Sequence, residues 1–172
     1  AGSSSFRLWT TDGTITGTKA LKEFSSPSNS SRDYFVWNGT LFFTADNRLW
    51  ISDGTEAGTV RFGDGRALQT IERIEIDGTL FLAIHSVTGR ELWRTDGTQS
   101  GSVSLHAFPR NNPHNSVGIH AFAQANGTLF FTAYDETGGF EPWKSDGTAA
   151  GTARLGDLNP GSGSSFPTRS QM

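Results

Sequence analysis

The stretch Glu91-Leu92-Trp93-Arg94-Thr95-Asp96-Gly97-Thr98, followed by Gly101-Ser102, recurs in related form four times along the chain. The shared pattern is x-Trp-x-[Ser/Thr]-Asp-Gly-Thr-x-x-Gly-[Thr/Ser], and the aspartates of successive copies are 41, 43 and 50 residues apart. The turns of the four copies are Asp12-Gly13-Thr14, Asp53-Gly54-Thr55, Asp96-Gly97-Thr98 and Asp146-Gly147-Thr148. A repeat of this length predicts a chain built from tandem copies of one supersecondary unit.

A second motif precedes three of the four copies and reads [Asn/Asp]-Gly-Thr-Leu-Phe-[Phe/Leu], starting at Asn38, Asp77 and Asn126. An Asn-Gly or Asp-Gly pair between apolar runs favours a tight hairpin, because both central residues of a type I′ turn have positive φ. The flanking runs are five to seven residues long and rich in Phe, Trp, Thr, Val and Ile. Such runs are typical of β-strands. Each repeat is therefore expected to fold as antiparallel strands joined by tight turns.

One complete repeat divides into four strands. In the last repeat we expect strands over Ile119–Ala125, Leu129–Asp135, Phe140–Ser145 and Ala153–Leu158. Four antiparallel strands in about 40–50 residues match the size of a β-propeller blade, and stacked blades bury both faces of each sheet. The sequence therefore predicts an all-β fold, a β-propeller-like array of four-stranded antiparallel blades. A linear β-solenoid or stacked β-array is the alternative, and a single β-sandwich is the third choice.

The repeats also predict the domain organisation. We expect a partial blade with only its last two strands at 1–24, complete blades at 33–64, 71–108 and 117–158, and a linker towards a next blade at 159–172. Together these segments form one repeat domain of about 3.5 blades. Because the first blade lacks two strands, we expect an excerpt of a longer repeat protein, or a chain whose open edge another protein chain completes.

The composition excludes several classes of protein. The 172 residues include 21 glycines and 12% aromatic residues, but only 34% apolar residues and no cysteine. Without cysteine there is no disulfide scaffold, thiolate zinc site or cysteine nucleophile. A net charge of −3 without a basic block argues against nucleic-acid binding. The longest apolar runs, such as Leu41–Ala45, are too short to insert into a membrane as a helix. A cysteine-free, Ser/Thr/Asn/Gly-rich chain fits an extracellular or cell-surface location.

The motif at Glu91-Leu92-Trp93 through Thr98 resembles the ELWxxDGT repeat, which occurs in tandem in large secreted or surface proteins, chiefly of bacteria. The resemblance covers essentially the whole chain. It implies a propeller-like fold and an extracellular setting, and it implies no catalytic residues. The fourth copy departs from it with Glu141-Pro142. Because proline lacks a ladder donor, we expect the Pro142 nitrogen to face away from a partner.

The motif residues have both a structural and a functional interpretation. Each motif aspartate could bind calcium, but a lone Asp before Gly-Thr fits an Asx-turn better than a calcium loop, which needs several oxygens at alternating positions. No cofactor is therefore expected; calcium is conceivable but not indicated. Four tryptophans recur at one motif position and could stack on sugars, but such periodicity favours packing between blades. These inter-blade core residues are Trp9, Trp50, Trp93 and Trp143.

Some candidate sites lie outside the repeat motif. Trp37 is out of register with the repeat and is a candidate for ligand contact, although packing at the edge of a sheet is the favoured interpretation, and Tyr134 is another candidate. Asn29, Asn38 and Asn126 each begin an Asn-x-[Ser/Thr] glycosylation sequon, two of them in expected hairpin turns.

Three functions from different classes remain after these observations. The leading hypothesis is a non-enzymatic extracellular repeat scaffold for adhesion or for surface or matrix assembly, with adjacent repeats or another chain as partner. The second is a lectin-like propeller that binds glycans. The third is a cryptic hydrolase, because Asp135, Glu136 and Glu141 form a local carboxylate cluster.

Overall fold

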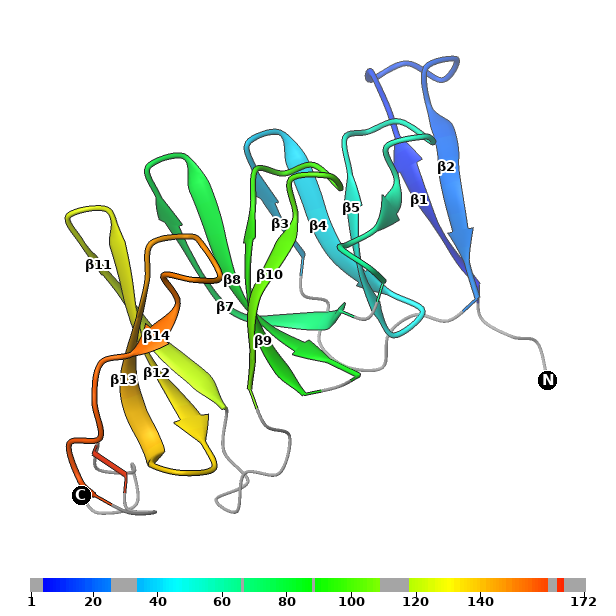
Figure 1. The fold of residues 1–172 in the computed structure, drawn as a ribbon. Coiled ribbons are helices and arrows are strands. Elements are labelled where there is room, and N and C mark those ends of the chain that lie inside the picture. Colours follow the sequence, from blue (N-terminus) through cyan, green and yellow to red (C-terminus); the bar gives the residue numbers. More distant parts are fainter. Residues whose placement is uncertain are drawn as a thin grey trace, which may run out of the picture. The chain divides into compact units, whose positions relative to one another are not determined.

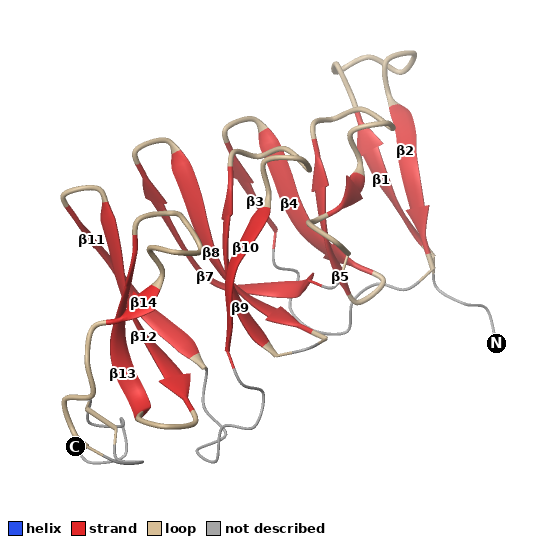
Figure 2. Ribbon diagram, in the orientation of Figure 1, coloured by secondary structure: helices blue, strands red, loops and turns tan. Residues whose placement is uncertain are grey.

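The structure, a computed structural model, describes residues 5–25, 34–65, 67–87, 89–108, 118–160 and 164–165. In these ranges the regular elements are fourteen β-strands, arranged as one two-stranded and three four-stranded antiparallel sheets (Figures 1 and 2). The predicted all-β class is therefore confirmed. No helix in the described ranges is long and apolar enough to cross a membrane.

Each sheet is a simple meander in which strands adjacent in sequence are adjacent in the sheet. The first sheet pairs β1 (Phe6–Thr10) with β2 (Lys19–Phe24). The second contains β3 (Tyr34–Trp37), β4 (Thr40–Ala45), β5 (Arg48–Ser52) and β6 (Val60–Arg61). The third contains β7 (Ala67–Ile76), β8 (Thr79–Ser86), β9 (Arg90–Thr95) and β10 (Val103–Phe108). The fourth contains β11 (Ile119–Ala125), β12 (Thr128–Asp135), β13 (Gly139–Ser145) and β14 (Ala153–Arg154).

The tight turns have the backbone geometry that the sequence predicts. At the β3–β4 turn, φ is 47° at Asn38 and 74° at Gly39. The equivalent pairs are Asp77-Gly78, with 48° and 75°, and Asn126-Gly127, with 49° and 74°. Positive φ at both central residues is the signature of a type I′ turn, whose twist matches that of the flanking strands. These turns fix the register of each first hairpin.

The outermost strand of the last sheet is shorter than expected. We predicted a strand to Leu158, but β14 ends at Arg154 after pairing with Trp143 and Lys144. Leu155 N–H still donates to Pro142 O at 2.9 Å, and the chain then leaves the ladder. The N and O of a strand residue point to the same side of the strand, so the Pro142 nitrogen also faces the β14 side. It lies beyond Trp143 and Lys144, the two residues of β13 that pair with β14.

The chain divides into two compact units, residues 1–69 with 97–102, and residues 70–96 with 103–172. In the first unit, β1–β2 packs on the β3–β6 sheet around a small aromatic core of Phe24, Phe43, Ala45 and Trp50, with Phe6, Leu8 and Leu41 beside it. In the second unit, the β7–β10 and β11–β14 sheets share a larger core of Ile76, Phe81, Ala83, Leu92, Leu105, Phe108, Ile119, Leu129, Phe131, Ala133 and Trp143. Each unit is thus a pair of sheets with an apolar layer between them.

Candidate functional site

The motif turn is a closed network of hydrogen bonds around its aspartate. In the fourth copy, Asp146 Oδ1 accepts bonds from the backbone N–H and the hydroxyl of Thr148, at 2.8 and 2.7 Å. Thr148 Oγ1 accepts the N–H of Gly151 at 2.9 Å, and Thr148 O accepts the hydroxyl of Thr152 at 2.7 Å. Ser145 Oγ lies 2.7 Å from Thr152 Oγ1. This is an Asx-turn that uses every polar side chain of the motif.

The network recurs in the other copies. Oδ1 of Asp12 and of Asp53 accepts the same two bonds from the threonine two residues later, at 2.7 to 2.9 Å. In the third copy, Thr98 accepts the N–H of Gly101 at 2.9 Å and the hydroxyl of Ser102 at 2.6 Å. The spacing of the motif therefore follows from the hydrogen bonds of one turn.

The two glycine positions of the motif each require glycine, but for different physical reasons. Gly147 follows the aspartate directly and has a φ of 87°, where a side chain would be strained. The second glycine is required by close approach, because a Cβ on Gly17, Gly58 or Gly151 would overlap the carboxylate of the motif aspartate. The motif thus encodes a turn that closes on its own carboxylate.

These bonds favour the ionised form of the motif aspartates. The side-chain hydrogen bond from the following threonine, and then the bond from its backbone amide, lower the pKa of Asp12, Asp53 and Asp146 below its ordinary value. In each turn one carboxylate oxygen is thus committed to local donors. Within the described ranges there is no group of three or more His, Cys, Asp or Glu residues that could hold a metal ion.

Two of the four motif tryptophans lie between sheets. Trp50 on β5 meets Phe24 on β2 edge to face, with ring centroids 5.1 Å apart and an interplanar angle of 79°. Trp143 on β13 meets Phe108 on β10 in the same way, at 5.0 Å and 80°. Trp50 is 6% exposed and Trp143 is 7% exposed. Each contact joins the third strand of one repeat to the outermost strand of the preceding repeat.

The other two motif tryptophans differ from each other. Trp93 is buried, and its Nε1 donates to Glu91 Oε2 at 2.7 Å. Trp9 is 54% exposed, so it is not part of the core of the described sheets. Its neighbour on β1, Leu8, packs in the core of the first unit, and alternation along the strand turns Trp9 to the opposite face. No described strand precedes β1 to cover that face.

The two predicted ligand contacts are both packed into the fold. Tyr134 is buried against Phe140, with ring centroids 5.4 Å apart, which corrects its assignment as a ligand contact. The physical reason is that both faces of β12 are covered. Trp37 is half-buried and lies beside Gly97. A Cβ added to Gly97 would lie 3.6 Å from Cζ3 of Trp37. Thr40 Oγ1 donates to Gly97 O at 3.3 Å, so Trp37 lies against the third motif turn.

Two of the three sequon asparagines lie within the described residues. Asn38 and Asn126 are exposed at the first positions of tight turns, where their side chains are open to modification. Asn29 lies outside the described residues.

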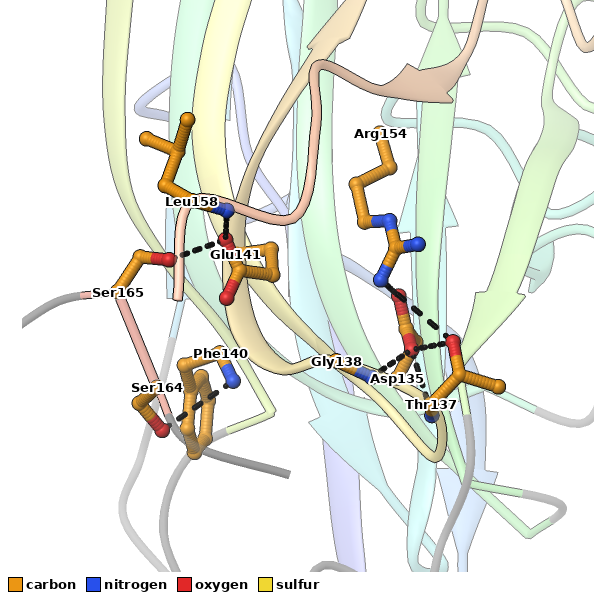
Figure 3. Close-up of polar contacts among 9 residues, drawn as sticks. All are labelled: Asp135, Thr137, Gly138, Phe140, Glu141, Arg154, Leu158, Ser164 and Ser165. Atoms are coloured by element: carbon orange, nitrogen blue, oxygen red, sulfur yellow. Dashed lines mark hydrogen bonds and ion pairs between the residues drawn. The ribbon is translucent and has the colours of Figure 1, made fainter. Parts of the chain in front are cut away.

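The carboxylate cluster separates into residues with different surroundings (Figure 3). Asp135 Oδ1 accepts three bonds, from the amide and hydroxyl of Thr137 and the amide of Gly138, and Oδ2 pairs with Arg154 at 3.0 Å. Burial raises the pKa of Asp135, but these hydrogen bonds and the Arg154 charge together bring it below its usual value. Glu136 is exposed. Asp135 is therefore a further Asx-turn residue, outside the repeat motif, and is held by an ion pair.

Glu141 on β13 is completely buried and anchors the segment that follows β14. Its Oε2 accepts the backbone N–H of Leu158 at 3.2 Å and the hydroxyl of Ser165 (Figure 3). Ser165 N–H also donates to Phe140 O at 3.0 Å. Glu141 Oε1 is buried without a hydrogen-bond partner. A retaining or inverting glycosidase needs two carboxylates that reach the same glycosidic bond, whereas Asp135 and Glu141 contact parts of the chain itself.

Sequence reasoning missed the equivalent carboxylate in the third repeat. Glu91 on β9 precedes Leu92-Trp93 as Glu141 precedes Pro142-Trp143. Its Oε1 accepts the hydroxyl of Ser86 at 2.7 Å, while Oε2 accepts Nε1 of Trp93. The available signal was the glutamate two residues before the motif tryptophan in both copies. A buried carboxylate with donors on both oxygens is a packing element of the sheet.

A groove in the first unit was also not anticipated. It has a volume of about 490 Å³ and includes Lys22, Trp50 and Arg61 in its lining. Lys22 Nζ lies 5.1 Å from the Trp50 ring centroid, and Arg61 Cζ lies 5.5 Å from it. Two cations over one aromatic ring form cation–π contacts, and Asp64 adds an acidic group to the same lining.

No protein-family model and no curated protein matches the chain. Solved structures show a weak likeness. A crystal structure of puromycin hydrolase has a TM-score of 0.47 and 12% identity over 88% of this chain, which spans 24% of the hydrolase. The computationally designed Ika8 protein has a TM-score of 0.45 and 16% identity, with 86% of this chain and 42% of that chain covered. The designed Ika4 protein has a TM-score of 0.44 and 15% identity, with 82% and 79% covered.

Proposed function

We propose that the chain is a non-enzymatic repeat scaffold whose blades form a propeller-like array for adhesion or assembly at an extracellular surface or matrix. The observation that carries this proposal is the repeated contact of Phe24 with Trp50 and of Phe108 with Trp143. The same residue positions hold one repeat to the next in both units. In repeat proteins of this kind, each sheet is stabilised by its neighbour, and the surface is free to bind other molecules.

The closed motif turns support the same function. Their shared Asp, Gly and Thr residues form hydrogen bonds that stabilise a hairpin turn. Residues used in this way have a structural role rather than a catalytic one. The resemblance to the ELWxxDGT repeat supports the propeller-like arrangement and the extracellular setting. The surroundings of Asp135 and Glu141, both bonded to nearby chain segments, favour the scaffold over the hydrolase.

The test compares the three functions in one set of measurements. Melting temperatures are recorded with a glycan library, and turnover is measured with ester, glycoside and peptide substrates. The scaffold predicts no turnover and no glycan that raises the melting temperature. Turnover that is lost in Asp135→Asn would replace it with a hydrolase. Fractionation of cells that produce the natural protein tests the location, since a protein confined to the cytosol contradicts an extracellular scaffold.

A glycan-binding function remains the second candidate because of the groove at Trp50. Its size is within the range of small-ligand sites, and Lys22 and Arg61 would attract an acidic sugar. An acidic glycan that binds the wild type and not Arg61→Met would support this function. Arg48→Met is a suitable control, because Arg48 belongs to the same sheet and is not among the groove residues.

A further inference from the structure

In the third repeat, a buried glutamate is held by side chains of its own sheet. Glu91 on β9 accepts the hydroxyl of Ser86 on β8 and Nε1 of Trp93 on its own strand, each at 2.7 Å. Ser104 on β10 donates a longer bond to the same carboxylate, at 3.4 Å. The carboxylate thus has a donor on each oxygen, and the buried indole nitrogen has an acceptor.

The fourth repeat has the same glutamate and tryptophan, but both serines are replaced. Asp135 on β12 corresponds to Ser86, since each stands eight residues after the glycine of its tight turn. Arg154 on β14 corresponds to Ser104, since each stands eight residues after its motif aspartate and pairs with the motif tryptophan in the sheet. Asp135 and Arg154 pair with each other at 3.0 Å (Figure 3). Two donors to the glutamate are therefore replaced by an ion pair that donates nothing to it.

Glu141, the glutamate of the fourth repeat, takes its donors from outside its sheet. Its Oε2 accepts the backbone N–H of Leu158 at 3.2 Å and the hydroxyl of Ser165, both in the chain that follows β14 (Figure 3). Its Oε1 is buried without a partner, and so is Nε1 of Trp143. Residues two apart on a strand lie on the same face of the sheet. An unused acceptor and an unused donor therefore belong to one face of β13, at the positions that are bonded to each other in the third repeat.

We propose that Glu141 is a latch with two positions. In the position seen here it holds the chain after β14, and in the other it accepts Nε1 of Trp143. A rotation of the glutamate side chain is sufficient, because the same spacing on one strand produces the bond between Glu91 and Trp93.

The ion pair of Asp135 with Arg154 selects the position seen here. Without hydroxyl donors from β12 and β14, the carboxylate finds only Trp143 in its own sheet, whereas the chain after β14 offers it two donors. Trp143 also packs against Phe108 between the two sheets of the second unit. The latch therefore links the path of the chain after β14 to the packing of these sheets. This device goes beyond the proposed scaffold function and does not depend on it.

A measurement on the wild type tests the proposal without any substitution. Both Trp93 and Trp143 are buried, but Nε1 of Trp93 has a carboxylate acceptor and Nε1 of Trp143 has none. The indole proton of Trp143 should therefore exchange with solvent faster than that of Trp93, as measured by NMR. Equal protection would show that the Trp143 indole is already bonded and would overturn the latch.

The second test converts the fourth repeat to the residue pattern of the third. In the full chain with Asp135→Ser and Arg154→Ser, Glu141 should regain hydroxyl donors in its own sheet. Amide exchange at Leu158 should become about tenfold faster, because this group loses its acceptor. Exchange of the Trp143 indole proton should become about tenfold slower, because it gains one. A general loss of stability would instead speed exchange at both sites.

Two further variants make the result specific to the carboxylate. Arg7→Ser with Glu23→Ser is the matched control, because it removes an exposed ion pair of the first unit and should leave both exchange rates unchanged. Glu141→Leu added to the converted repeat should abolish the slower exchange at Trp143. An indole proton that exchanges at the wild-type rate or faster in the converted repeat overturns the proposal, as does an unchanged Leu158 amide. Neither result affects the scaffold function, which the substrate and glycan measurements test separately.

Discussion

The phenyl ring of Phe108 stands nearly perpendicular to the indole of Trp143, at 80° with ring centroids 5.0 Å apart. It ties β10 of one repeat to β13 of the next, and His106 on the same strand contacts the indole as well, at 4.9 Å. Edge-to-face pairs add to the free energy gained by burying two large rings. The neighbouring repeat is therefore part of the core of each sheet.

Truncation of this contact should destabilise both sheets of the second unit together. Phe108→Ala is expected to reduce the free energy of unfolding by about 3–5 kcal/mol, because it leaves a cavity beside Trp143 and Phe131. Urea unfolding followed by tryptophan fluorescence measures the change. Val103→Ala on the same strand is the control, since Val103 is exposed and its truncation should cost no more than about 0.5 kcal/mol. A similar loss in both variants would contradict the packing role of Phe108.

The close approach of Gly151 to Asp146 predicts strong coupling between these residues. Gly151→Ala should be destabilising, because its methyl group would overlap the Asp146 carboxylate. Asp146→Ala should also be destabilising, because the amide and hydroxyl of Thr148 lose their acceptor. The double variant should be more stable than the sum of the single losses predicts, since without the carboxylate the methyl group has room.

The Asp146→Ala variant also distinguishes a structural role of the aspartate in the turn from a role in calcium binding. The losses in Asp146→Ala should be equal with calcium and with a chelator, as measured by melting temperature. A loss seen only in the presence of calcium would assign the aspartate to a metal site. Ala150→Ser in the same turn is the control, because Ala150 is exposed and should tolerate the change.

Acid should weaken the motif turns over a definite range of pH. Hydrogen bonds from the following threonine lower the pKa of Asp12, Asp53 and Asp146 in the folded chain. A lowered pKa stabilises the folded state above the unfolded value of 3.8, and this contribution is lost as pH falls through the folded pKa. Melting temperatures between pH 6 and 2.5 should show this fall. Thr148→Val should be less stable at pH 6 and should approach the wild type at the acid end.

Much of the architecture can be predicted from the sequence, because the same local pattern of strand and turn residues recurs four times along the chain. The Asn126-Gly127 turn and β11 lie where the sequence predicts them, since positive φ and strand alternation are local properties. The exposure of Trp9 was not predictable, because burial at a repeat position depends on a neighbouring sheet. The roles of Glu91 and Glu141 were missed for the same reason. Their partners Ser86 and Ser165 lie outside the motif.

The ion pair of Asp135 with Arg154 should contribute to stability and not to catalysis. Asp135→Asn is expected to cost about 1–2 kcal/mol, because it weakens the bonds from Thr137 and Gly138 and removes the attraction to Arg154. Chemical denaturation measures this loss. Glu136→Gln is the control, since Glu136 is exposed and should have little effect. A hydrolytic activity lost in Asp135→Asn with unchanged stability would reverse this assignment.

Glu91 and Glu141 occupy equivalent positions, but we expect their replacement by leucine to change stability to different extents. Both carboxylates are buried two residues before a motif tryptophan, but Glu91 has donors on both oxygens, whereas Oε1 of Glu141 has none. Glu91→Leu should cost about 1–3 kcal/mol, because Nε1 of Trp93 is left buried without an acceptor.

Glu141→Leu should be close to neutral by comparison. It removes a buried carboxyl group whose Oε1 has no hydrogen-bond partner, and burying a polar atom without a partner is itself costly. Its measurable effect should be local: faster hydrogen exchange at the Leu158 amide, which loses its acceptor. Equal losses of stability at the two positions would show that the unpartnered oxygen of Glu141 carries no energetic cost. A larger loss at Glu141 would instead make the anchored segment after β14 a main source of stability for the second unit.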